Sequence, residues 1–151
     1  MPAGNFTLYN SFAEFIADGT IDLDSDTFKI ALLDSGYTPN LAHDEWADVS
    51  GDEIANGAGY TSGGGTLTGV TWSQTGGVAT FDSDNFVWTA SGGSISARYA
   101  VIYDDTSSGD KLIGYYLLDT APADVTATDG NTFTVGPHAS NGWFQLTVNP
   151  A

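Results

Sequence analysis

Apolar and polar residues alternate along much of this chain, which is the pattern of β-strands that bury one face. The clearest case covers residues 95–103. One face of this run carries Ile95, Ala97, Tyr99, Val101 and Tyr103. The other face begins with polar residues and becomes apolar towards its end, so we expect a strand at the centre of a sheet, with its second face covered late in its length.

Similar runs, separated by Gly, Asn, Asp and Ser, predict seven further strands. They cover residues 27–33, 67–73, 78–82, 85–89, 111–118, 131–135 and 143–148. Short strands at this spacing are typical of two sheets packed face to face. The pattern therefore predicts a mainly β fold, either an antiparallel β-sandwich or a flattened barrel.

One segment near the N-terminus has helical spacing instead. Ser11 and Glu14 are placed as in a capping box, apolar residues follow on one face, and Gly19 offers a C-terminal stop. We expect a short α-helix over residues 11–18, preceded by an N-terminal arm over residues 1–10.

The segment from about residue 37 to residue 65 shows neither the alternation of a strand nor the spacing of an amphipathic helix, and it becomes rich in glycine. Its run Ser62–Gly65 lacks the Lys-Ser/Thr of a phosphate-binding P-loop, so we expect a long flexible loop. The 151 residues suit one β-sandwich domain over 1–151 that includes this loop.

The charge is strongly negative, because 19 Asp and Glu residues face only three Lys and Arg, for a net charge of -16. Such a surface repels phosphates, so we expect no direct contact with nucleic acid or with an anionic membrane. A basic or neutral protein surface is the natural partner. Arg98, the only arginine, is expected to pair with a carboxylate.

The chain has no cysteine, which excludes disulfides, thiolate metal sites and a cysteine nucleophile. It also has no apolar run of transmembrane length and no secretory signal at its N-terminus. We therefore expect a protein that is made in the cytoplasm of its producing cell and leaves it only as part of a particle.

Three aspartates at alternate positions, Asp22, Asp24 and Asp26, raise the question of calcium. An EF-hand loop that begins at Asp22 would need Gly where Thr27 stands and Glu where Leu33 stands, so that signature fails. A looser calcium cage, closed by Asp82 and Asp84 or by Asp104 and Asp105, remains the alternative to solvated carboxylates at the entry to a strand.

Nothing in the sequence indicates catalysis. With so many carboxylates, any acid-base pair is uninformative, His43 and His138 lie far apart in sequence, and no serine has the context of a nucleophile elbow. We expect no enzyme. Of the four tryptophans, Trp46 is the candidate for exposure, and the other three are expected in the core rather than on a sugar-binding surface.

Several passages, taken together and in order, resemble a family of small virion structural proteins of tailed bacteriophages. They are FKIALLDSGYTPN (28–40), HDEWADVSGDEIANGAGYTSGGGTLTG (43–69), VATFDSDNFVW (78–88), SISARYAVIYDD (94–105) and LIGYYLLD (112–119). The resemblance covers residues 5–148. It implies a non-enzymatic structural role on the particle, often as a head decoration or cement protein. The acidic charge favours the outer capsid surface over the DNA-filled interior, with the major capsid protein as the expected partner. Self-association into a homo-oligomer, such as a trimer, is left open.

For such a protein the expected contact elements are the N-terminal arm and the long loop. Their candidate anchors are Phe6, Leu8, Tyr9, Tyr37, Trp46 and Tyr60. A tail or neck component of the particle is the alternative function, and a carbohydrate-binding β-sandwich module for host attachment is a third.

Overall fold

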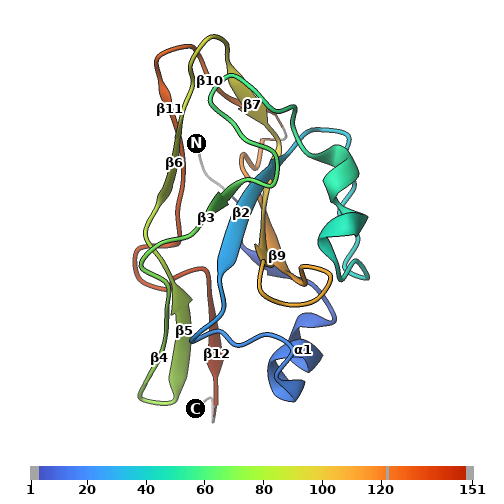
Figure 1. Cartoon of the computed structure of the whole chain (residues 1–151). Coiled ribbons are helices and arrows are strands. Elements are labelled where there is room, and N and C mark those ends of the chain that lie inside the picture. Colours follow the sequence, from blue (N-terminus) through green and yellow to red (C-terminus); the bar gives the residue numbers. More distant parts are fainter. Residues whose placement is uncertain (1–3, 122, 149–151) are drawn as a thin grey trace.

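The computed structural model describes residues 4–121 and 123–148, and it is mainly β with two facing layers (Figure 1). Its strands are β1 (Thr7–Leu8), β2 (Phe28–Leu33), β3 (Gly65–Thr66), β4 (Thr71–Thr75), β5 (Val78–Asp82), β6 (Phe86–Thr89), β7 (Ile95–Ala97), β8 (Tyr99–Asp104), β9 (Leu112–Leu117), β10 (Val125–Ala127), β11 (Thr132–Val135) and β12 (Phe144–Thr147). The predicted fold class is confirmed in its sandwich form, since the sheets do not close into a barrel.

The first layer is one five-stranded antiparallel sheet in the order β1-β9-β8-β2-β3. Its central strands β2 and β8 pair in register, with Ile30 opposite Ile102. Both faces of β2 are buried, because the second layer covers one face and the segment after β2 covers the other. This explains why β2 is almost continuously apolar.

The second layer consists of three smaller antiparallel sheets, β12-β5-β4, β11-β6 and β10-β7. In the three-stranded sheet Trp72, Phe81 and Phe144 stand opposite one another. Phe81 contacts Phe28 of the first layer, with ring centroids 5.1 Å apart in an edge-to-face arrangement. Aromatic side chains thus join the two layers.

The long predicted strand 95–103 forms two strands, β7 and β8. The strand is interrupted at Arg98, where the chain passes from the second layer to the first. The Arg98 N–H donates to the Leu33 carbonyl, and the Arg98 carbonyl accepts the N–H of Leu118. The guanidinium Nε lies 2.8 Å from Oδ1 of Asp124, which confirms the expected carboxylate partner.

Two further boundaries differ from the prediction. The expected strand 67–73 is wrong: a loop containing Gly69, at φ 62°, separates β3 from β4. Within the expected arm, residues 1–3 lie outside the described residues, and β1 pairs with β9 and forms the edge of the first sheet. The described part of the arm therefore belongs to the first sheet.

The helix α1 (Phe12–Asp18) is confirmed at the predicted place. Ser11 occupies the N-cap position, but its side chain makes no capping hydrogen bond, so the predicted capping box does not form. Gly19 ends the helix in the left-handed conformation at φ 82°. Phe12 packs against Phe144, with centroids 5.1 Å apart, and fixes the helix beside β12.

Candidate functional site

The long segment after β2 packs against the first sheet through buried tyrosines, which corrects one group of predicted anchors. Tyr60 is 2% exposed, and its hydroxyl donates to Glu53 at 2.7 Å and accepts the N–H of Leu32 at 3.1 Å. Burial raises the pKa of the Tyr60 hydroxyl. This ring is a core residue and offers no exposed contact surface.

Tyr9 and Tyr37 are likewise buried, at 2% and 3% exposure. Their hydroxyls share a hydrogen bond of 2.8 Å that joins the N-terminal segment to the residues after β2. Burial, followed by the hydrogen bond with Tyr37, raises the pKa of Tyr9. The expectation that these two rings are exposed anchors is therefore wrong, because each finds its partner within the chain.

Trp46 lies in the short 3₁₀ helix η1 (Trp46–Asp48) and is only half-buried. Its ring stacks on Tyr103 of β8 with centroids 4.6 Å apart. A second 3₁₀ helix, η2 (Ser50–Asp52), follows directly. Among the predicted anchors, Trp46, Phe6 and Leu8 are the ones that keep part of their surface accessible.

We expect Tyr60→Phe to lower the free energy of unfolding by about 1–3 kcal/mol, because it leaves the buried Leu32 N–H without an acceptor. Urea unfolding followed by tryptophan fluorescence measures the effect. Tyr115→Phe is the matched control, since the Tyr115 hydroxyl makes no hydrogen bond within residues 4–121 and 123–148. Equal stability of both variants would contradict a structural role for the Tyr60 hydroxyl.

The three aspartates before β2 lie in turns and not on a strand, so they do not share one strand face. The Asp22 carboxylate accepts the N–H of Asp24 at 3.0 Å, and the Asp26 carboxylate accepts the N–H of Asp22 at 2.7 Å. In the described part of the chain no three His, Asp or Glu side chains are grouped so that they could hold a metal ion.

One carboxyl group, that of Asp104 at the end of β8, is fully buried. Its Oδ1 accepts the N–H of Thr106 at 2.8 Å and that of Ser107 at 3.3 Å, whereas its Oδ2 meets no donor. Burial raises the pKa of Asp104 to about 6, and the neighbouring carboxyl of Asp26 adds to this rise. From the sequence, Asp104 was considered only as part of an acidic pair with Asp105 that could close a looser calcium site, and its burial was not foreseen.

The outer surface carries almost no free positive charge. Each cationic side chain forms an ion pair with a carboxylate. The Lys29 Nζ lies 3.0 Å from Oδ1 of Asp105, and the Arg98 Nε lies 2.8 Å from Oδ1 of Asp124. The Lys111 Nζ lies 2.5 Å from Oε1 of Glu45. All three cationic side chains are thus neutralised within the fold, and the excess of 16 negative charges remains. The surface is anionic on the scale of the whole molecule.

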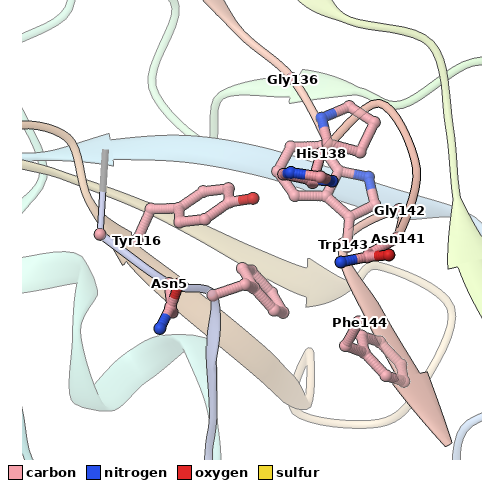
Figure 2. A pocket seen from close by; sticks show the side chains of 11 residues that line it. Asn5, Tyr116, Gly136, His138, Asn141, Gly142, Trp143 and Phe144 are labelled. Atoms are coloured by element: carbon pink, nitrogen blue, oxygen red, sulfur yellow. The ribbon is translucent and has the colours of Figure 1, made fainter. Parts of the chain in front are cut away.

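A hollow of about 430 Å³ opens where the N-terminal segment meets the residues before β12. Figure 2 shows Tyr116 and Asn5 on one side of it, and His138, Trp143 and Asn141 on the other. The hollow lies on the open side of the sandwich, between the edge strands β1 and β12. Its volume falls within the range of roughly 300–1,000 Å³ that small-molecule sites occupy.

Comparisons of this chain with protein-family models, with curated proteins and with solved structures found no match.

Within residues 4–121 and 123–148, no helix is long and apolar enough to cross a membrane.

Proposed function

We propose that this protein is a non-enzymatic structural component of a phage particle that binds the outer surface of the head and stabilises contacts between major capsid subunits. The observation that carries the proposal is the anionic surface, in which each of the three cationic side chains already has a carboxylate partner. Such a surface complements a basic protein surface and is repelled by packed DNA. The resemblance of residues 5–148 to virion proteins supports a place on the particle, and the charge favours the outside of the head.

The contact would combine a ring of carboxylates with a few apolar anchors. Leu146 and Val148, at the end of β12, are 48% and 57% exposed. Phe6, Leu8 and Trp46 keep part of their surface accessible as well. These five side chains replace the buried tyrosines as the anchors that we expect at the capsid, with a second copy of the chain as the further partner in an oligomer.

The location can be tested on purified particles of the phage that encodes the chain. We expect an electron-microscopy map to place the protein over the junctions between capsid subunits. Density in the tail or neck would select the alternative structural role, and absence of the chain from the particles would overturn both.

The electrostatic part of the proposal has its own test. We expect the protein to leave isolated heads as the salt concentration rises, because contacts between exposed charges are screened within a Debye length of about 10 Å at 0.1 M salt. Sedimentation of heads over a salt series measures the bound fraction. A bound fraction that does not change up to 1 M salt would contradict a charge-based contact.

A further inference from the structure

We propose that the hollow between the N-terminal segment and residues 136–144 binds one or two units of a neutral carbohydrate. The inference goes beyond attachment to a particle, since it concerns a different class of ligand; the two surfaces share Phe6, whereas the other four proposed anchors do not line the hollow. It rests on the rings, the unpaired polar groups and the charge of this hollow.

Four aromatic rings form its wall. Phe6 is their common member, with centroid distances of 5.2 Å to Tyr116, 5.7 Å to Trp143 and 6.3 Å to Phe144. Phe6 and Phe144 are half-buried, so their rings are partly accessible from the hollow. The negative face of an aromatic ring attracts the polarised C–H groups on the apolar face of a pyranose.

Polar groups without partners surround these rings. The Tyr116 hydroxyl points into the hollow (Figure 2) and makes no hydrogen bond to any residue that the structure describes. The side-chain amides of Asn5 and Asn141 are exposed and equally unpaired within that part of the chain. Hydroxyl and amide groups can donate and accept, which is what the hydroxyl groups of a sugar require.

The fourth polar side chain is that of His138. Its Nδ1 accepts the N–H of Ser140 at 3.2 Å, so the hydrogen on a neutral imidazole sits on Nε2. The ring lies on the opposite side of the hollow from Tyr116 (Figure 2). His138 and Tyr116 therefore place hydrogen-bond donors on two sides of the hollow.

Among the residues that the structure describes, no Asp, Glu, Lys or Arg lines the hollow, although the protein is rich in carboxylates. A cationic ligand would therefore lack a counter-charge here, and an anionic ligand would be repelled by the surrounding surface. Neutral ligands with many hydroxyl groups fit this environment best.

The hollow continues beyond one sugar unit. A second hollow of about 270 Å³ shares Tyr116 and Gly136 with the first and lies against Val125 and Phe133. A linear oligosaccharide could place a second unit there, on a more apolar surface.

Binding can be tested with three neutral hexasaccharides (maltohexaose, cellohexaose and chitohexaose) and one anionic one, hexagalacturonate. We expect at least one neutral probe to shift the indole N–H resonance of Trp143 saturably, with a dissociation constant of about 1 mM or tighter. Hexagalacturonate should bind at least about tenfold more weakly because of the charge repulsion.

Single-residue variants of the rim locate the site. Asn141→Ala and Asn5→Ala should each weaken binding by about tenfold, which corresponds to one lost hydrogen bond. Asn10→Ala is the matched control, since Asn10 is exposed, does not line the hollow and should leave affinity unchanged. None of these exposed side chains makes a hydrogen bond within the described residues, so the variants should fold normally.

Three outcomes would overturn the inference: no shift with any neutral probe, equal affinity for the anionic probe, or equal weakening by Asn10→Ala and Asn141→Ala. The proposed attachment to capsids has a different measurement, the occupancy of phage heads, so the two proposals can fail independently. The rim variants should occupy phage heads as fully as the unchanged protein does.

Discussion

Replacing Asp104 by Asn will raise the free energy of unfolding at pH 7 by about 2 kcal/mol, because it removes a buried negative charge. In the folded protein the Asp104 Oδ2 meets no donor, and Asp26 is its acidic neighbour. The asparagine can keep the hydrogen bonds from Thr106 and Ser107 through its oxygen, and its amide can donate to Asp26. The substitution thus supplies a donor where the wild type has none.

The gain in the free energy of unfolding from Asp104→Asn should increase as the pH rises from 4 to 7. The folded pKa of Asp104, about 6, lies above the value of 3.8 for an unperturbed aspartate, so the folded state holds a proton that the unfolded state has already lost. The stability that this proton provides is complete below about pH 4 and is lost as the pH rises through 6. The variant and the wild type should therefore be equally stable near pH 4 and should diverge up to pH 7.

Urea unfolding at pH 4, 5, 6 and 7 measures this difference, and comparison of the two proteins at each pH cancels the other titrating groups. Asp24→Asn is the matched control, since Asp24 is exposed and its side chain makes no hydrogen bond within residues 4–121 and 123–148. A difference between the Asp104 variant and the wild type that does not change with pH would contradict the role of this carboxyl.

Replacing Gly64 by Ala will lower the free energy of unfolding by about 4 kcal/mol, the largest loss that we expect from a single methyl group in this protein. Gly64 has φ 73°, and a Cβ at this position would lie 1.9 Å from the backbone oxygen of Ile30 in β2. A backbone carbonyl inside a paired strand cannot move away as a flexible side chain can. The segment that contains Gly64 would have to move away from β2.

Gly76→Ala separates the steric cost from the conformational one. Gly76 has φ 61°, close to that of Gly64, but a Cβ there would meet nothing within 4 Å. We expect this control to cost about 1 kcal/mol, the cost of left-handed backbone for an L-residue. If urea unfolding shows that both variants lose the same free energy of unfolding, the steric contact between a Cβ at position 64 and β2 does not add to the cost.

The sequence predicted the strands that carry a clear two-residue period. β6 and β11 fall within one residue of their expected ends, because alternation is strong where one face meets a core. The two- and three-residue strands β1 and β10 were missed. They contain too few residues to show a period, and partners distant in sequence create them.

The glycine run before β3 shows a different limit. We expected Ser62–Gly65 to be a flexible loop, yet its last residues need glycine because other groups lie so close. A Cβ at Gly65 would lie 2.0 Å from the ring of Phe86. Composition alone cannot distinguish a glycine that provides mobility from one that permits close packing.

The candidate site was the least predictable part of the molecule. Tyr9 and Tyr37 were expected at the surface because they lie in the N-terminal arm and the long loop, but their shared hydrogen bond joins residues 28 positions apart. The hollow likewise combines residues from the two ends of the chain, such as Asn5 and Asn141. No local pattern signals either arrangement, although the closely spaced aromatic and amide residues of 138–144 are a weak sign.

The passage of one chain segment from layer to layer at Arg98 has a consequence for how the molecule comes apart. β7 belongs to the second layer and β8 to the first, and backbone hydrogen bonds hold Arg98 itself to Leu33 and Leu118. Neither layer can open without pulling on the other through this short tether. Amide hydrogens of β2 and β11 should therefore exchange with solvent at the rate of global unfolding, as a single cooperative unit.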